Sequence, residues 1–131
     1  MYQWLKGYKE QEQQISYLKW SLTKSELELE RWIYGDLATL NIEKNSRSSI
    51  LEKNIKRMKQ EIERLEKNKQ AVKQFVDNLE GIENEIVKLK YIDGMTLEEI
   101  AQTTKYSFSY IRQKHSNIRK LTSLVNEYKN E

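Results

Sequence analysis

The side chains with the clearest chemistry lie near the C-terminal end of the chain. Four residues there could contact bases: Phe108, Ser109, Arg112 and Gln113. An arginine can pair with a guanine edge, a glutamine with an adenine edge, and an aromatic ring can pack on a thymine methyl group. The combination is typical of a helix that enters the major groove, although each residue taken singly could be an ordinary surface residue.

Charge is unevenly distributed around these four residues. Residues 104–121 carry five lysines and arginines and no acid, whereas residues 80–99 carry six acids and two lysines. A concentrated positive segment is the usual mark of a phosphate-binding face, and a solvated helix surface is the alternative. In the first interpretation, further residues could contact phosphates: Ser107, Tyr110, Lys114, Arg119 and Lys120.

A capping box predicts the first of two helices that would position these side chains. In residues 96–99 the threonine can cap the helix while the glutamate reaches back to it. We expect a helix of about two turns, from Leu97 to about Thr103. An earlier helix ends at Asp93-Gly94, where the glycine can take the left-handed conformation. The apolar positions of that earlier helix are Ile82, Ile86, Leu89 and Ile92.

A tight turn over residues 104–106 leads to the second helix. Ser107 can cap this helix, which we expect to run to about Tyr128. Two helices that cross sharply need a small residue where they touch and apolar residues around it. The sequence offers four such residues in order: Ile100, Ala101, Tyr106 and Ile111. The pattern predicts a helix-turn-helix, with one departure at Lys105, where the turn needs positive φ and usually holds glycine.

A heptad pattern occupies the middle of the chain. The sequence has no proline and only four glycines, which favours long uninterrupted helices. Ser49 and Glu52 form a second capping box, so we expect this helix to begin near Ile50. Its seam comprises Leu51, Ile55, Met58, Ile62, Leu65, Lys69, Val72, Val76 and Leu79. Such a helix is unstable alone, so the seam needs a partner.

The N-terminal segment is the expected partner. Its apolar stripe comprises Leu5, Tyr8, Ile15, Leu18, Leu22, Leu29 and Ile33. Ser25 and Glu28 could form a third capping box and break this helix near residues 21–25. A polar stretch over about 35–48 predicts a loop. We therefore expect an all-α fold in which an antiparallel helical hairpin, residues 1–79, precedes a helix-turn-helix domain, residues 80–131.

All three tryptophans fall in the predicted N-terminal helix. Trp4, Trp20 and Trp32 could form the hairpin core or, because tryptophan dominates interface hot spots, a docking surface. Trp20 does not share the face of Leu18 and Leu22 and is the best candidate for an exposed anchor. A two-helix seam buries little apolar surface, so we also expect a homodimer through the hairpin.

The composition disfavours several kinds of site. Without cysteine no disulfide can form, and a single histidine, His115, leaves too few ligands for zinc, so we expect no metal and no cofactor. We expect His115 at the surface or facing the groove. We expect no enzyme, because acid–base catalysis needs companion groups that the sequence does not supply. The chain has no apolar signal region and no membrane-spanning run, which favours the cytoplasm.

Residues 83–121 resemble region 4 of bacterial sigma factors. The shared motifs are LKYIDGMTLEEIA, residues 89–101, and YSFSYIRQ, residues 106–113. The whole chain is similar to the ArpU-like late transcription regulators of phages of Gram-positive bacteria, which often carry an ERW…GDL-like stretch, here over residues 30–37. The chain departs from region 4 at Lys114, where an apolar residue is common. It also has one residue fewer between Ile111 and the later apolar positions Ile118 and Leu121.

The resemblance implies a sequence-specific DNA-binding transcription regulator, a phage late-gene activator that acts with host RNA polymerase in the bacterial cytoplasm. The four base-contacting candidates would then meet double-stranded promoter DNA. One alternative is a small terminase-like DNA-packaging protein, which the C-terminal position of the predicted helix-turn-helix disfavours. Another is a sigma-mimicking interaction protein, which the basic recognition face disfavours.

Overall fold

The computed structural model describes residues 2–39 and 41–130, with side chains described over 2–39 and 45–124. Within these ranges every regular element is a helix and no strand occurs, as predicted. The chain divides into two compact units. We call Glu12–Lys67 the paired-helix unit, and Met1–Gln11 together with Asn68–Glu131 the multi-helix unit. The division expected from the sequence lay at residue 79, and it placed the first residues of the chain with the hairpin.

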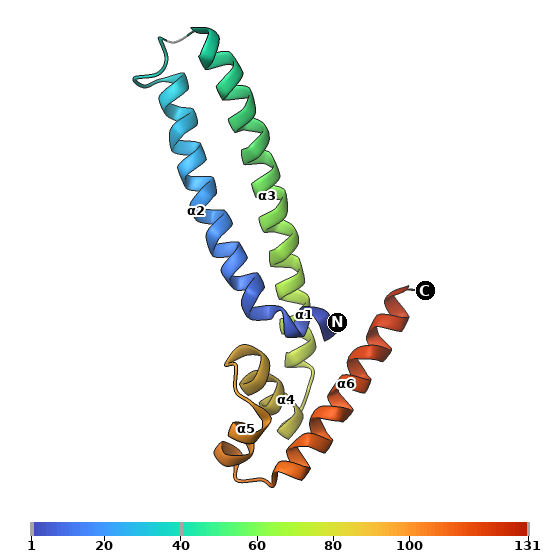
Figure 1. The fold of residues 1–131 in the computed structure, drawn as a ribbon. Helices are drawn as coiled ribbons and strands as arrows, with labels where there is room; N and C mark the ends of the chain where they lie inside the picture. Colours follow the sequence, from blue (N-terminus) through green and yellow to red (C-terminus); the bar gives the residue numbers. More distant parts are fainter. Residues whose placement is uncertain (1, 40, 131) are drawn as a thin grey trace. The chain divides into compact units, whose positions relative to one another are not determined.

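The paired-helix unit is formed by parts of two long helices, α2 (Tyr8–Ile33) and α3 (Asn41–Asp77). They run side by side in opposite directions (Figure 1). Among the described side chains, two ion pairs join them: Lys19 Nζ lies 3.1 Å from Glu66 Oε1, and the Arg47 guanidinium donates to both Glu28 carboxylate oxygens at 3.1 and 3.2 Å. Exposed pairs of this kind contribute little stability, so the apolar seam holds the helices together.

The heptad seam predicted for α3 is confirmed by burial. Within the paired-helix unit the seam buries Leu51, Ile55 and Leu65, and α2 contributes Ile15 and Trp32. The tryptophan is buried in place of Ile33, which is half-buried. Spacings of three and four therefore run along the inner sides of both helices, as a two-helix seam requires.

Helix α3 begins at Asn41, so the predicted start near Ile50 is wrong. The predicted loop over 35–48 is confirmed for residues 35–39 and wrong from Asn41 onward. The heptad seam continues further back than the apolar residues indicate: Ser48, seven residues before Ile55, is half-buried. Ser49 lies inside the helix with its side chain exposed. A seam that packs against a neighbour overrides the local preference of serine and asparagine for loops.

Helix α2 is continuous, so the predicted break near residues 21–25 is also wrong. Ser25 is half-buried inside the helix, and the Glu28 carboxylate receives Arg47 from α3 rather than capping. The break lies instead at Gly7, which separates α2 from the short α1 (Tyr2–Lys6).

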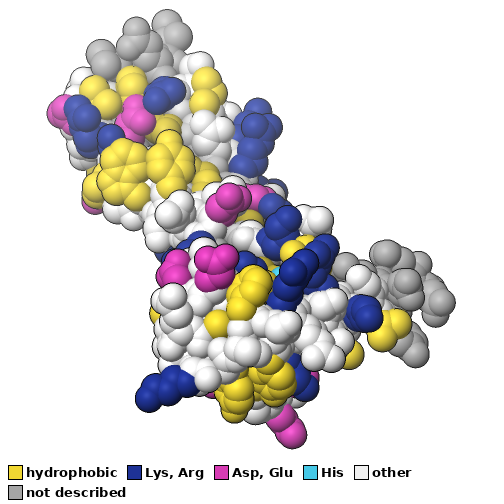
Figure 2. All heavy atoms as spheres, turned by 60° about the horizontal axis from the view of Figure 1, so that its bottom comes forward, with side chains coloured by type: hydrophobic (Ala, Val, Ile, Leu, Met, Phe, Trp, Pro, Cys, Tyr) yellow, Lys and Arg dark blue, Asp and Glu magenta, His cyan; other side chains and the backbone are white. Residues whose placement is uncertain are grey.

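A second set of apolar side chains, on α2 and directly after its end, is exposed. Tyr17, Trp20, Leu27 and Tyr34 are between 57% and 84% exposed. Figure 2 shows hydrophobic side chains open to solvent on this unit. The long helix thus carries apolar residues on two sides, of which one is packed against α3.

The multi-helix unit adds α4 (Gly81–Val87), the π-helix η1 (Lys88–Ile92), α5 (Leu97–Thr104) and α6 (Phe108–Asn130). One core joins them to α1, to the start of α2 and to the end of α3. Its largest fully buried side chains are Leu5, Val72, Val76, Ile86, Val87, Ile100, Ile111, Ile118 and Thr122. The N-terminal segment is therefore part of the core on which α5 and α6 rest.

The turn between η1 and α5 follows the sequence prediction. Gly94 has φ +80°, and the Met95 N–H donates to the Leu89 carbonyl at 2.9 Å, which closes the helix end. A Cβ at Gly94 would also lie 2.8 Å from Lys9 Nζ. The preceding π turn places Tyr91 in the core, five residues after Ile86.

Candidate nucleic-acid interface

A capped helix begins the candidate interface. The Thr96 Oγ1 accepts the Glu99 N–H at 3.1 Å, and the Thr96 hydroxyl donates to Glu99 Oε1 at 3.2 Å. The predicted cap and a helix over Leu97–Thr104 are therefore confirmed. Two carboxylates in its first turn, Glu98 and Glu99, face the positive end of the helix dipole.

The turn after α5 has the geometry expected from the sequence. Lys105 takes φ 64°, the only positive φ at a non-glycine residue in the described part of the chain. Ser107 Oγ accepts the Tyr110 N–H at 3.1 Å and so caps α6. Lysine in this conformation carries a steric cost of about 1 kcal/mol relative to glycine, which the surrounding core offsets.

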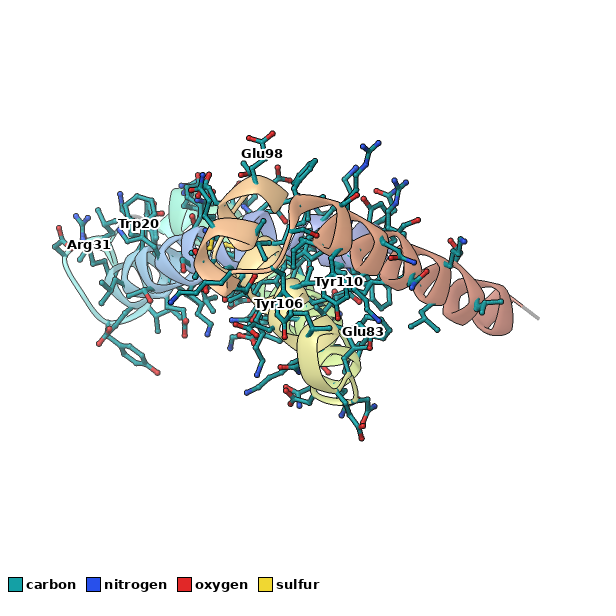
Figure 3. The ribbon with its side chains drawn as sticks, turned by 90° about the horizontal axis from the view of Figure 1, so that it is seen from below. Trp20, Arg31, Glu83, Glu98, Tyr106 and Tyr110 are labelled. Atoms are coloured by element: carbon teal, nitrogen blue, oxygen red, sulfur yellow. The ribbon has the colours of Figure 1, made fainter. Side chains whose placement is uncertain are left out.

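Three of the four residues predicted to join α5 to α6 are buried. Ile100 and Ile111 have no exposed surface, and Ala101 is 8% exposed. The prediction that Tyr106 packs between the two helices is wrong. Tyr106 is 49% exposed, and the centre of its ring lies 4.9 Å from that of Tyr110 (Figure 3). Its ring packs on the neighbouring tyrosine, which allows the polar tip of this amphipathic side chain to stay in water.

His115 belongs to the core, so its predicted place at the surface is wrong. It is 9% exposed, stacks on Tyr91 with ring centres 5.8 Å apart, and shares a hydrogen bond of 2.5 Å between its Nε2 and the Tyr91 hydroxyl. Burial, together with the charges of Lys90 and Arg119, lowers the pKa of His115 to about 4. Burial also raises the pKa of Tyr91, with Tyr2 as a second cause. Both groups are therefore neutral near pH 7.

The buried side of α6 follows one helical spacing. Ile111, His115, Ile118 and Thr122 succeed each other at intervals of four, three and four, and all are buried. Leu121 is 43% exposed, so the stripe continues through Thr122, whose hydroxyl donates to the Arg119 carbonyl at 2.7 Å. The same spacing in the sequence could have identified His115 as a core residue.

The exposed basic face of α6 lies beside this buried stripe. It comprises Phe108, Ser109, Arg112, Gln113, Ser116, Arg119, Lys120 and Ser123, all exposed. A shallow hollow of about 250 Å³ is lined by its last four members. The Arg119 guanidinium lies 4.9 Å from the centre of the Tyr2 ring, so α1 helps to position it. Ser116 and Ser123 were not predicted as binding residues. Nothing in the sequence distinguishes them from other serines, and only the structure shows them beside Arg119 and Lys120.

Two predicted phosphate contacts lie on the other flank of α6. Tyr110 and Lys114 are half-buried. Lys114 Nζ lies 5.6 Å from the Tyr110 ring centre and 3.9 Å from Glu83 Oε1 of α4. Figure 3 shows Tyr110 beside Tyr106, with Glu83 nearby. The structure therefore separates these two residues from the basic face, and the Lys114 charge is partly neutralised.

The three tryptophans have different surroundings. Trp32 is buried in the seam, and Trp4 packs against the core of the multi-helix unit. Trp20 is 57% exposed, as predicted for an anchor. Only Trp20 is thus open to a partner.

The described residues contain no group of histidine, cysteine, aspartate and glutamate that could hold a metal ion. Among them, no helix is both long and apolar enough to cross a membrane. No family model, curated protein or solved structure matches the chain. The candidate interface is therefore interpreted from its own geometry.

Proposed function

We propose that the chain is a sequence-specific DNA-binding transcription regulator. In this proposal α5, the Lys105 turn and α6 act as a helix-turn-helix, and α2 with α3 forms a helical hairpin. The observation that carries it is the basic face of α6. This face is open to solvent, holds Arg112, Arg119 and Lys120, and has no acid among residues 108–124.

The residues of this face would have two roles in DNA binding, contact with bases and contact with phosphates. Arg112 and Gln113 lie in the first two turns of α6, the part of a recognition helix that reaches base edges. Arg119 and Lys120, one to two turns further on, would bind phosphates, and the hydroxyls of Ser116 and Ser123 could add hydrogen bonds. Lys114, which faces Glu83, would contribute less to phosphate binding than the net charge of residues 104–121 suggests.

The resemblance to sigma region 4 and to ArpU-like phage regulators favours activation of late genes with host RNA polymerase in the bacterial cytoplasm. Chromatin immunoprecipitation with sequencing in the host tests this biological role. Strong signal at a few promoters supports regulation, whereas signal confined to a packaging site would support the terminase-like alternative.

The molecular test is binding of three variants to specific and scrambled duplexes across a salt series. Arg112→Ala and Gln113→Ala should each lose roughly 1–3 kcal/mol at the preferred site and flatten the preference among sequences. Lys120→Ala should weaken all sequences alike and reduce the salt slope by about one unit.

Lys67→Ala is the matched control, because Lys67 is an exposed lysine of the paired-helix unit whose Nζ lies 3.2 Å from Glu63 Oε1, also exposed. It should leave affinity and salt slope unchanged. If Arg112→Ala and Gln113→Ala also leave affinity and preference unchanged, α6 does not read DNA, and the interaction-protein alternative takes first place.

A further inference from the structure

The exposed side of α2 carries a second heptad pattern. We call it the outer heptad face. It comprises Tyr17, Trp20, Lys24, Leu27 and Arg31 of α2 and Tyr34 directly after it, at alternating spacings of three and four. Each position lies two residues after one of the inner seam, and thus on roughly the opposite side of the helix. Two shallow hollows of about 510 and 320 Å³ follow one another along it and share Leu27 and Arg31.

This face is apolar enough to mark an interaction surface. Trp20 and Leu27 are each 57% exposed, and Tyr17 and Tyr34 still more. Contiguous exposed apolar patches are uncommon on monomeric proteins unless a partner covers them. Every residue of the face belongs to the paired-helix unit, so its geometry does not depend on the multi-helix unit.

Charged groups interrupt the apolar positions in a regular way. Lys24 Nζ lies 4.6 Å from the centre of the Trp20 ring, and Arg31 donates to Asp36 at 2.9 and 2.8 Å. One of the two heptad positions of this face thus holds Lys24 and Arg31 in successive repeats. The other position holds Trp20, Leu27 and Tyr34. Glu30 lies beside Arg31, whereas the Glu28 carboxylate is bound to Arg47 of α3.

We propose that this face pairs with the same face of a second copy of the chain, in antiparallel orientation. A two-fold axis between Ser25 and Glu26 would set Trp20 opposite Arg31 of the second copy, and Lys24 opposite its Leu27. Tyr17 would lie opposite its Tyr34. Each contact occurs twice, because a two-fold interface uses the same patch on both copies.

Charge selects this orientation. Arginine over a tryptophan ring is a favourable cation–π contact, and the antiparallel arrangement forms it twice. It also brings Glu30 of one copy alongside Lys24 of the other. A parallel pair in register would instead set Lys24 against Lys24 and Arg31 against Arg31, and like charges that face each other repel.

The first test measures self-association of the full chain without DNA, by sedimentation across a concentration series. We expect a dimer, and we expect the double variant Trp20→Ala/Leu27→Ala to weaken its association constant at least about tenfold. Tyr106→Ala removes an aromatic ring of similar exposure from the multi-helix unit and should leave the constant unchanged. Circular dichroism checks that each variant keeps its helices.

The second test fixes the orientation by cross-linking. The chain has no cysteine, so introduced thiols react without background. A disulfide needs Cα atoms within about 7 Å, so Tyr17→Cys mixed with tagged Tyr34→Cys should cross-link on mild oxidation. Neither variant should cross-link alone. A monomer at every concentration would overturn the proposal and leave the face to an unrelated helical partner. Cross-linking of Tyr17→Cys to itself would overturn the antiparallel pairing.

Discussion

The multi-helix unit buries side chains from helices all along the chain in one core, whereas the paired-helix unit buries one stripe from each of two helices. The largest fully buried side chains all belong to the multi-helix unit, and the best-buried residues of the paired-helix unit, Leu51 and Leu65, keep 3% exposure. A core enclosed on all sides fixes its members in three dimensions. A seam fixes only the register of one helix against the other. The outer sides of both helices stay free for partners.

Truncation of one buried residue in each unit should lower the free energy of unfolding by different amounts in the two kinds of packing. Ile111→Ala leaves a cavity enclosed by several helices, and we expect a loss near the upper end of the usual range of about 2–5 kcal/mol. Leu65→Ala lies in a seam whose two helices can close the gap, so its loss should fall near the lower end. Chemical denaturation followed by circular dichroism measures both. Equal losses would contradict the contrast between the units.

Between pH 6.5 and 4.5, acid should weaken mainly the unit that holds the histidine. The unfolded chain protonates His115 as pH falls through about 6.5, whereas the folded chain holds its pKa at about 4. The free energy of unfolding is therefore highest above pH 6.5 and falls by up to about 3 kcal/mol between pH 6.5 and 4. Below pH 4 this group causes no further loss.

Hydrogen exchange at pH 6.5 and 4.5 can localise that loss. Protection should fall in the multi-helix unit and persist in the paired-helix unit, which has no histidine. His115→Gln is the control, because glutamine does not titrate and should remove most of the pH dependence. An unchanged pH profile in this variant would mean that another group causes the loss.

The smallest effect concerns two capping motifs that look alike in the sequence. Thr96→Ala removes a side chain that accepts the Glu99 N–H, and should cost about 1 kcal/mol. Ser49→Ala alters an exposed residue inside α3, where alanine is the better helix former, so stability should stay unchanged or rise by about 0.5 kcal/mol. Thermal unfolding compares the two variants directly. A similar loss in both would mean that Ser49 does cap a helix.

This contrast also explains what the sequence could predict. Patterns that depend on neighbouring residues alone were reliable where the chain must turn: the Thr96 cap, Gly94, Lys105 and the Ser107 cap are all confirmed. The same capping pattern at Ser25 and Ser49 was wrong, because packing between α2 and α3 keeps both residues helical. Local signals cannot report a seam formed with a distant segment.

Prediction of the candidate interface had a similar limit. The exposed positions of α6 followed from Ile111 facing inward, which burial confirms. His115 and Tyr106 were misplaced because polarity is a weak guide for residues that have both an apolar ring and a polar atom. The role of Tyr2 under Arg119 could not be predicted, since it depends on the N-terminal residues packing on α6.

The multi-helix unit is assembled from two separated stretches of chain, so the paired helices between them can change in length. Within that unit Lys69 Nζ lies 5.8 Å from the centre of the Tyr8 ring, so the chain leaves and re-enters at neighbouring places. The residues between them form a self-contained insertion whose register repeats every seven residues. Removing one heptad from each helix would shorten the paired helices by about 10 Å and would remove no residue of the multi-helix core. Evolution or a protein engineer could therefore adjust the length of the paired helices in fixed steps without redesigning the unit that holds α6.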